Sequence, residues 1–241
     1  MCGIAGVMTF DGSTPAAAVL DSLADCLAHR GPDGRGRHLA GNVGLAQTRL
    51  AIIDLETGDQ PLYAKAADGG QLALIANGEI YNYLELRRAM PDVAFATGSD
   101  CEPPLYLYRQ YGVDFAEHLR GMYAIALHDT ARDRLVLSRD PFGIKPLYYV
   151  LTATHMAFAS EPQALIRAGL AAAEMRVEGR DQLLQLQFTC GRETVYAGIE
   201  RVMPGETVVF ENGRLAERRH HPALPALGPR TQSETEAMAS L

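Results

Sequence analysis

The residue best equipped to do chemistry is Cys2, which follows the initiator methionine in Met1-Cys2-Gly3. Removal of Met1 would leave Cys2 with a thiol and a free α-amine on one residue. The thiolate is the nucleophilic form of cysteine, and an α-amine, with an ordinary pKa of roughly 7.7–8.0, is partly neutral near pH 7. One residue would then supply both a nucleophile and a base. Taken alone, Cys2 is equally explained as the residue that happens to follow a start codon, so other motifs must decide.

Three other stretches place polar or glycine residues in unusual settings. Arg49 stands just before a β-rich segment at 50–55, where a lone arginine is usually a solvated charge. The tripeptide Asn77-Gly78-Glu79 follows an apolar strand predicted at 72–76 and is expected to form the turn that ends it. Residues 31–36 contain three glycines and a proline. This composition predicts a loop without regular structure over 29–36.

A fourth polar stretch has the spacing of a helix start. Ser99 and Glu102 match a capping box, which predicts a helix that runs to about Tyr111. Asp100 would then lie in the first turn, where the helix dipole favours a carboxylate. That is a complete structural reason for Asp100, and it competes with any role in binding or catalysis.

Composition excludes several classes of protein. The 241 residues carry a net charge of −7, which gives no reason to expect nucleic acid or an anionic membrane as a partner. No apolar run approaches the roughly 18 residues that span a bilayer. The N-terminal residues lack the basic segment and apolar core of a signal peptide. We therefore expect a cytoplasmic protein.

The cysteines and glycines do not form a known cofactor pattern. Cys2, Cys26, Cys101 and Cys190 are widely spaced, which argues against a disulfide framework and against a zinc site, so no metal site is expected. Neither a P-loop nor a dinucleotide-binding glycine fingerprint occurs, so a nucleotide site on this chain is not expected either.

The order of predicted elements indicates an α+β fold with antiparallel sheets. Strands outnumber helices, and hairpins dominate the second half of the chain. Hairpins are expected over 122–139, 147–159 and 206–218; helices are expected over 14–30, 82–90, 99–111, 161–169 and 178–187. The composition changes at Pro222 to a proline- and alanine-rich stretch. We expect one domain over 1–221, followed at 222–241 by a linker and the start of a further domain.

Seven motifs occur along the chain in a fixed order. They are Met1-Cys2-Gly3-Ile4-Ala5-Gly6, His29-Arg30-Gly31-Pro32-Asp33, Arg49-Leu50-Ala51-Ile52-Ile53-Asp54, Asn77-Gly78-Glu79-Ile80-Tyr81-Asn82, Ser99-Asp100, Arg139-Asp140-Pro141-Phe142-Gly143-Ile144-Lys145-Pro146-Leu147-Tyr148-Tyr149 and Phe158-Ala159-Ser160-Glu161-Pro162. Together they resemble the glutaminase domain of glutamine-hydrolysing asparagine synthetase, a class II glutamine amidotransferase. The resemblance covers roughly residues 2–221.

The resemblance implies a fold and a reaction. The fold is the N-terminal-nucleophile four-layer αββα sandwich, with two antiparallel sheets between two helical layers. The reaction is hydrolysis of L-glutamine to glutamate and ammonia through a thioester on Cys2. Asn77, through its side-chain amide, and Gly78, through its backbone N–H, would stabilise the oxyanion.

The same resemblance assigns the residues that bind the glutamine backbone. Arg49 suits the α-carboxylate, because its planar guanidinium can bind both oxygens. Backbone groups of Leu50, Ala51, Ile52 and Ile53 would complete that end, and Asn77 and Gly78 would also contact the substrate. Glu79 and Asp100 suit the α-ammonium. For Asp100 this role is compatible with a place at a helix start.

Partners and cofactors follow from what the family carries beyond this domain. The ammonia would go to an ATP-dependent synthetase domain or subunit, and the chain lacks the Ser-Gly-Gly-x-Asp-Ser loop that binds ATP there. We therefore expect no cofactor on this chain, with ATP and magnesium confined to the synthetase. The chain is then either a fragment or a stand-alone glutaminase, and an oligomer is possible.

Three alternatives remain open at the level of sequence. The chain could serve the amidation of a carboxylate other than aspartate. It could be an N-terminal-nucleophile amidase that acts on another amide, although Arg49, Glu79 and Asp100 fit a free amino acid better. It could also be a non-catalytic binding domain, which the presence of Cys2 with Asn77-Gly78 argues against.

Overall fold

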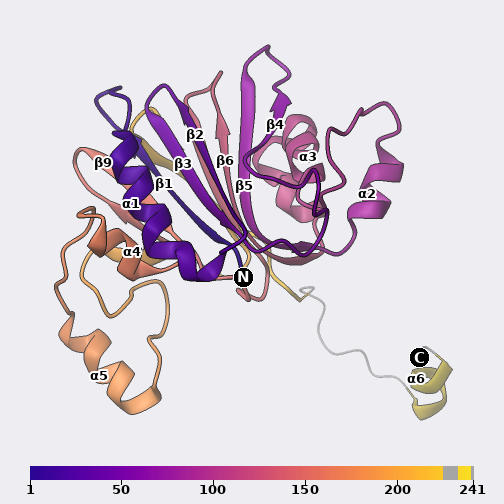
Figure 1. Cartoon of the computed structure of the whole chain (residues 1–241). Helices are drawn as coiled ribbons and strands as arrows, with labels where there is room; N and C mark the ends of the chain where they lie inside the picture. The colour runs from indigo at the N-terminus through magenta and orange to yellow at the C-terminus, as the bar shows by residue number, and fades with distance from the viewer. Residues whose placement is uncertain (225–232, 240–241) are drawn as a thin grey trace.

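The computed structural model describes residues 1–224 and 233–239, and all twelve strands in these residues belong to two antiparallel sheets (Figure 1). Sheet A has the strand order β10-β8-β9-β1-β3-β2 and sheet B the order β12-β11-β7-β6-β5-β4. The strands of sheet A are β1 (Gly3–Thr9), β2 (Gly34–Ala40), β3 (Val43–Arg49), β8 (Tyr148–Leu151), β9 (His155–Ala159) and β10 (Ile199–Arg201). Those of sheet B are β4 (Leu62–Lys65), β5 (Gln71–Ile80), β6 (Gly121–Asp129), β7 (Arg134–Arg139), β11 (Glu206–Glu211) and β12 (Arg214–His220).

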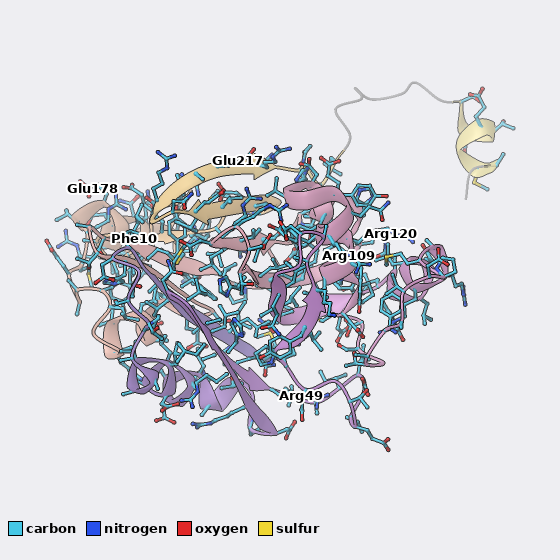
Figure 2. All side chains as sticks on the ribbon, turned by 90° about the horizontal axis from the view of Figure 1, so that it is seen from above. Phe10, Arg49, Arg109, Arg120, Glu178 and Glu217 are labelled. Carbon is cyan, nitrogen blue, oxygen red and sulfur yellow. The ribbon has the colours of Figure 1, made fainter. Side chains whose placement is uncertain are left out.

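Helices cover the outer faces of both sheets. The helices are α1 (Ala17–Leu27), α2 (Tyr83–Ala89), α3 (Pro103–Tyr111), α4 (Pro162–Arg167), α5 (Val177–Leu186) and α6 (Glu234–Ala239), with 3-10 turns η1 (Ala28–Arg30) and η2 (Gly112–His118). Glu178 on α5 and Arg120, which pairs with Glu85 of α2, lie at opposite sides of the molecule (Figure 2). No helix in the described residues is long and apolar enough to cross a bilayer.

Three apolar clusters hold these layers together. Ile4 of β1 and Ile75 of β5 belong to the cluster between the sheets. Leu23 of α1 packs with residues of sheet A, and Leu105 of α3 packs with residues of sheet B. Burial of these side chains is the main favourable term in folding. The predicted α+β class, with a four-layer αββα arrangement and two antiparallel sheets, is confirmed.

The predicted turn at Asn77-Gly78-Glu79 is wrong, because β5 continues through it to Ile80. Asn77 pairs with Ala124 of β6, and Gly78 pairs with Tyr123. A Cβ on Gly78 would lie 2.2 Å from the carbonyl oxygen of Met122. The glycine is therefore needed for close approach of two strands, and not for a turn.

Two further local predictions are wrong around Arg49. The β-rich segment 50–55 is a loop, because β3 ends at Arg49 and the Arg49 guanidinium donates to the carbonyls of Ile53 and Asp54. The glycine-rich stretch 29–36 is only partly irregular, since β2 begins at Gly34. A Cβ on Gly36 would lie 1.7 Å from the carbonyl oxygen of Gln60, so this glycine also serves a close approach.

The predicted capping box is not formed. Helix α3 begins at Pro103 without a side-chain cap, and Ser99 Oγ instead accepts from the backbone N–H of Cys101 (3.2 Å). The Glu102 carboxylate accepts from the backbone N–H groups of Ala96 (2.7 Å) and Thr97 (2.9 Å). These residues therefore organise the loop ahead of the helix.

The remaining element predictions are confirmed within a few residues, including the three hairpins and the helices near 14–30, 82–90, 161–169 and 178–187. The linker predicted from residue 222 falls mainly on 225–232, outside the described residues. Glu234–Ala239 forms α6.

A buried histidine pair joins the two sheets. His38 of β2 and His128 of β6 are 5% and 2% exposed, and His38 Nε2 lies 3.0 Å from His128 Nδ1. Burial and, to a smaller extent, the neighbouring His38 lower the pKa of His128 to about 4, and the charge of Asp129 opposes this shift. The pair is therefore neutral in the folded protein near pH 7.

This pair makes stability depend on pH between about 6.5 and 4. The folded pKa of His128 is below the ordinary value of 6.5, so in this range the unfolded chain binds the proton that the folded chain excludes. The free energy of unfolding should therefore fall as the pH drops from 6.5 to about 4, by up to roughly 3 kcal/mol. Urea unfolding at a series of pH values measures this slope.

His128→Asn should lower stability at pH 7 but flatten that slope. His118→Asn, at an exposed histidine, is the matched control and should keep the slope of the unchanged protein. An unchanged slope in His128→Asn would contradict this account of the pair.

Candidate functional site

A cavity opens between the two residues that precede β1, the C-terminal half of β5 and the loops that follow β3 and precede α3. It is lined by Met1, Cys2, Arg49, Leu50, Ile52, Ile53, Gly58, Gln60, Ala76, Asn77, Gly78, Glu79, Ser99, Asp100, Cys101 and Lys145. Every residue that the sequence predicted for the site is among these except Ala51. The backbone N–H of Ala51 donates instead to Asp33 (2.9 Å).

The Cys2 side chain is held at the edge of this cavity. Its Sγ accepts from the backbone N–H of Leu50 (3.3 Å), and its carbonyl accepts from Arg30 Nε (3.0 Å). Arg30 in turn pairs with Glu161 at the start of α4 (2.8 Å). A Cβ on Gly3 would lie 2.6 Å from Thr48 Oγ1, so only glycine lets the chain pass here. These contacts place a partly buried thiol beside the cavity.

Asn77 offers an unused hydrogen-bond donor at the same cavity. The residue is 1% exposed, and its Nδ2 has no partner within the described part of the chain. A buried polar group left without a partner costs about 1–3 kcal/mol. Since such groups are rare in folded proteins, an unpaired amide that lines a cavity indicates a donor reserved for a ligand.

The edge of β5 supplies a second donor. β4 pairs with β5 only as far as Leu74, so the edge of β5 beyond that residue is free of β4. Ala76 N donates to Gln60 Oε1 (2.6 Å) and Ile80 N donates to Asp100 Oδ2 (2.7 Å). Alternate N–H groups of a strand point to the same edge. The N–H of Gly78, midway between them, therefore points into the cavity beside the Asn77 amide.

Two carboxylates make one part of the cavity anionic. Asp100 is 4% exposed, and Glu79 is half-buried. Burial raises the pKa of Asp100, and the charge of Glu79 raises it further, while the hydrogen bond from Ile80 N opposes both. A cationic ligand group at this position would relieve the repulsion between the two carboxylates.

Arg49 is one of two buried cations of the cavity, each at 8% exposure; the other is Lys145. The Arg49 Nη1 lies 2.7 Å from Asp59 Oδ1, and the Asp59 side chain is 82% exposed. An ion pair with so exposed a partner is worth little, so an anionic group of a ligand can replace Asp59 at small cost. Arg49 is therefore available for a carboxylate.

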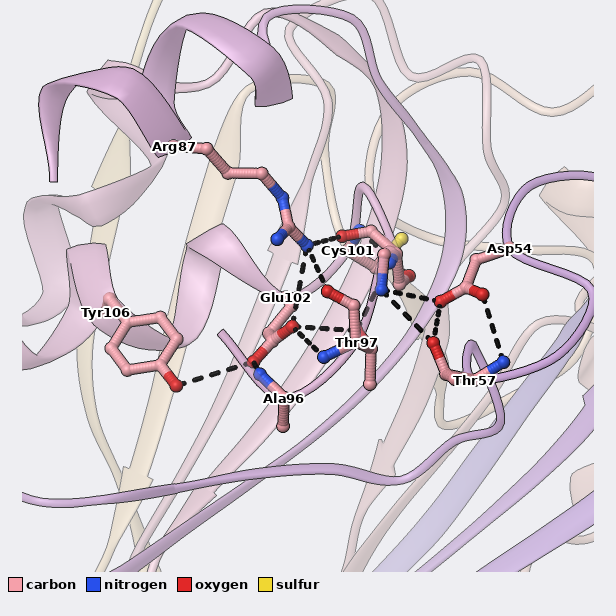
Figure 3. A network of polar contacts seen from close by, with 10 residues as sticks. Asp54, Thr57, Arg87, Ala96, Thr97, Cys101, Glu102 and Tyr106 are labelled. Atoms are coloured by element: carbon pink, nitrogen blue, oxygen red, sulfur yellow. Dashed lines mark hydrogen bonds and ion pairs between the residues drawn. The ribbon is translucent and has the colours of Figure 1, made fainter. Parts of the chain in front are cut away.

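Hydrogen bonds to the Asp54 carboxylate, here called the polar tie, hold the 50–59 loop of the cavity in place. Asp54 has a positive φ of 53°, and its carboxylate accepts from Thr57 Oγ1 (2.6 Å) and from the backbone N–H of Gly98 (2.7 Å) (Figure 3). Burial alone would raise the pKa of Asp54, but these hydrogen bonds lower it overall. Asp54 therefore joins the 50–59 loop to the loop that leads to Asp100.

Arg87 of α2 holds the loop that leads to Asp100. Arg87 of α2 donates to the carbonyls of Thr97 (2.9 Å) and Ser99 (2.7 Å), and it lies near the buried carboxylate of Glu102 (Figure 3). This network orients the backbone on which Asp100 sits. Side chains remote from the cavity thus position a carboxylate inside it.

Four polar residues of the cavity were not predicted as site residues: Gln60, Ser99, Cys101 and Lys145. Ser99 and Lys145 belong to the motifs at 99–100 and 139–149, and Cys101 directly follows Asp100, so the motifs could have indicated all three. Burial raises the pKa of the Cys101 thiol well above its usual range, which makes it a poor nucleophile. Gln60 carried no signal, because its role is to accept from the backbone of Ala76.

One group of residues outside the cavity has a spacing that suits a metal ion. The ligand atoms of Asp114, Glu117 and His221 lie within 4.8 Å of one another. Arg219 already pairs with Asp114, and His221 Nδ1 lies 3.1 Å from Glu117. Internal ion pairs account for this cluster.

Comparison with known proteins identifies similar sequences. The chain matches the family described as "Glutamine amidotransferase domain" over residues 1–221. It is 38% identical over 168 residues to asparagine synthetase [glutamine-hydrolyzing] 2 of Bacillus subtilis (strain 168), covering 68% of this chain and 22% of that protein. It is 34% identical over 236 residues to amidase chry2 of Gibberella zeae, covering 92% of this chain and 34% of that protein. The chain thus spans about a fifth to a third of these relatives.

A solved structure shares the fold. The allosteric regulatory enzyme of purine biosynthesis superimposes with a TM-score of 0.69 at 19% sequence identity, over 91% of this chain and 49% of that one. At this identity the likeness speaks for the fold alone. It agrees with the two antiparallel sheets and their helical layers.

If the polar tie holds the two loops together, loss of the Asp54 carboxylate should increase the motion of the loop that contains Gly98. In Asp54→Ala the N–H of Gly98 loses its carboxylate acceptor, so its hydrogen exchange should accelerate by roughly 10-fold or more, as expected for loss of about 1.5–3 kcal/mol from a charged hydrogen bond. Exchange measured by NMR or mass spectrometry reports this. The amides of β5 should stay protected, because the sheet is untouched.

Glu56→Ala is the matched control for this experiment. Glu56 is an exposed carboxylate in the same loop, and its removal should leave Gly98 exchange unchanged. Equal acceleration in both variants would show that the Asp54 contact does not hold the two loops together.

Proposed function

The chain belongs to the glutamine amidotransferase domain family, and from that premise we propose that it hydrolyses L-glutamine to glutamate and ammonia through a thioester on Cys2. The observation that carries the proposal is the meeting of the Cys2 thiol and the unpartnered Asn77 amide at one cavity. A nucleophile beside unused donors suits attack on an amide carbonyl, because that carbonyl becomes an oxyanion.

The reaction begins when Met1 is removed. The Cys2 thiol gives its proton to the α-amine of the same residue, directly or through a water, and the thiolate attacks the side-chain amide carbon. The amine then returns a proton to the departing nitrogen, which leaves as ammonia. Water adds to the resulting thioester, glutamate is released and the thiol is restored.

The oxyanion of each tetrahedral intermediate lies between two donors. The Asn77 Nδ2 and the N–H of Gly78 would bind it, since both donors face the cavity. Neither donor has to move to reach the oxyanion. Because the amide is already desolvated, its hydrogen bond to a developing negative charge is stronger than in water. These hydrogen bonds to the oxyanion lower the activation free energy of the hydrolysis.

The ends of the cavity select a free amino acid. Arg49 would exchange Asp59 for the α-carboxylate, with backbone groups of Leu50 to Ile53 at that end. Glu79 and Asp100 would bind the α-ammonium, which removes the repulsion between these two carboxylates. An amide that lacks these charged groups would leave the buried charges of the cavity uncompensated, so an acylated metabolite is a poorer substrate.

We propose that the ammonia serves an ATP-dependent synthetase domain or subunit that makes asparagine. The asparagine synthetase relatives support this acceptor. A second candidate is an N-terminal-nucleophile amidase that acts on another amide; the relative named as an amidase, which matches 92% of this chain, supports it. For the leading candidate, ATP and magnesium belong to the synthetase, and the hydrolysis itself uses only the cavity residues.

The proposal predicts the outcome of a glutaminase assay. Protein without Met1, verified by mass spectrometry, should release glutamate from L-glutamine. Cys2→Ala and a form that retains Met1 should both lose activity by at least roughly 10³-fold, because one lacks the nucleophile and the other lacks the free amine on Cys2.

Cys26→Ala is the matched control. This half-buried thiol lies on α1 and does not line the cavity, so its loss should leave the rate unchanged. Glutamate release that survives Cys2→Ala would refute the thioester mechanism. Absence of release from the folded, Met1-free protein would refute the proposed reaction of this chain.

A further inference from the structure

One charged side chain of the cavity has no part in the reaction described above. Lys145 is 8% exposed and lines the cavity, yet its Nζ makes no hydrogen bond or ion pair within residues 1–224 and 233–239. Arg49, the other buried cation of the cavity, pairs with Asp59. A charge taken out of water is costly unless it is paired. An unpaired ammonium on a residue that lines a cavity therefore indicates a place for an anionic group of a ligand.

The backbone of Lys145 is held on both sides. Its N–H donates to Asp140 Oδ2 (3.0 Å), and its carbonyl accepts from Arg139 Nε (2.7 Å). The fully buried Asp140 carboxylate also accepts from the backbone N–H groups of Phe142 (3.1 Å) and Ile144 (2.9 Å). These contacts fix the loop between β7 and β8, so the position of the lysine does not depend on a contact of its ammonium.

The strand register places Lys145 at the same end of sheet A as Cys2. Tyr148 of β8 pairs with Ala159 of β9, which pairs with Ala5 of β1. Both pairings are antiparallel, so β8 and β1 run in the same direction. Lys145 lies three residues before Tyr148. Cys2 lies three residues before Ala5, so the chain enters both strands from the same edge of the sheet.

The order of the strands places the two buried cations on opposite sides of Cys2. This part of sheet A has the order β8-β9-β1-β3, and β9, β1 and β3 lie side by side in Figure 1. Arg49 is the last residue of β3, and its neighbour Thr48 pairs with Gly3 of β1. Lys145 precedes β8, which lies on the other side of β1 from β3. A ligand that binds Arg49 at one end and lies against Cys2 at the other therefore extends toward Lys145.

A further contact anchors Lys145 beside the oxyanion donors. Asp140 Oδ2, which accepts from the Lys145 N–H, also accepts from the N–H of Tyr123 on β6 (3.3 Å). Tyr123 pairs with Gly78 of β5. The loop of Lys145 is thus attached to the strand next to the Gly78 donor.

We propose that the Lys145 ammonium binds the γ-carboxylate of L-glutamate, the product of the hydrolysis, and so forms a second carboxylate subsite of the cavity. This inference rests on the proposed function. Hydrolysis converts a neutral side-chain amide into a carboxylate, so a negative charge appears at the reacting end of the ligand. Arg49 would hold the α-carboxylate in substrate and product alike. Lys145 therefore distinguishes the two ligands, because it favours binding of glutamate and retains the product.

Ligand binding to protein that cannot turn over glutamine tests this subsite. Isothermal calorimetry with L-glutamate and L-glutamine is carried out on Met1-free Cys2→Ala, the reference protein, and on the same protein with Lys145→Met or Lys145→Arg. Lys65→Met is the matched control. Lys65, the only other lysine of the chain, is exposed on β4 and does not line the cavity.

The subsite predicts a selective loss of glutamate affinity. Lys145→Met removes a charge-assisted hydrogen bond, so the Kd of glutamate should rise by roughly 10-fold or more, while that of glutamine changes by less than about threefold. Lys145→Arg keeps the positive charge and should bind glutamate more tightly than Lys145→Met. Lys65→Met should match the reference protein with both ligands. The free energy of unfolding of Lys145→Met should not fall, because the ammonium has no partner in the described part of the chain.

A spectroscopic measurement shows whether the ammonium itself contacts the ligand. Because the chain has two lysines, protein labelled with ¹³C at the lysine ε-carbon gives two signals, which Lys65→Arg assigns. Glutamate should shift the Lys145 signal of the reference protein and leave that of Lys65 in place.

Three outcomes would overturn the subsite. They are an unchanged glutamate affinity in Lys145→Met, an equal loss of affinity for glutamate and glutamine, and a Lys145 signal that glutamate does not shift. Equal loss of both ligands would assign Lys145 to the α-carboxylate end or to the shape of the cavity. Failure of the reference protein to bind either ligand would instead refute the proposed function, whereas binding of both without a selective effect of Lys145→Met refutes the subsite alone.

Discussion

The site depends on one edge of strand β5 that lacks a partner strand. β4 pairs with β5 no further than Leu74, and the N–H groups of alternate residues beyond it face the cavity. Ala76 and Ile80 satisfy theirs with Gln60 and Asp100. The N–H of Gly78 and the amide of Asn77 lie between these two anchors. Because the anchors fix the strand, the two donors are held in place without a ligand, as an oxyanion site requires.

Apolar packing elsewhere in the molecule offsets the loss of stability that the buried polar groups of the site cause. An unpaired buried amide and a buried Asp100 both lower stability, and the three apolar clusters of the sandwich offset that cost. The loops that complete the cavity are fastened by polar ties from Asp54, Arg87 and Glu102 instead of by apolar packing. Stability thus resides in the sheets, and the loops around the substrate depend on individual hydrogen bonds that a ligand can rearrange.

The sequence predicted the fold class, the hairpins and nine of the sixteen residues that line the cavity, because motifs and turn dipeptides are local. It misread Gly78 and Gly36 as turn or loop signals, since a glycine needed for close approach of two strands looks the same in sequence. The spacing of Ser99 and Glu102 matched a capping box, yet Glu102 accepts from the preceding loop. Gln60 carried no signal, because its role exists only after β4 and β5 have paired. Long-range contacts of this kind leave no local pattern.

The most direct test of the account is the steady-state kinetics of Asn77→Ala on L-glutamine. If the amide stabilises the oxyanion, kcat should fall by roughly 10²–10³ while KM changes little. Its free energy of unfolding should not fall, because the amide has no partner to lose. Asn42→Ala, at a buried asparagine that donates to the carbonyl of Thr9 (3.1 Å), should show the reverse: lower stability and unchanged kcat. An unchanged kcat in Asn77→Ala would contradict the proposed role of β5.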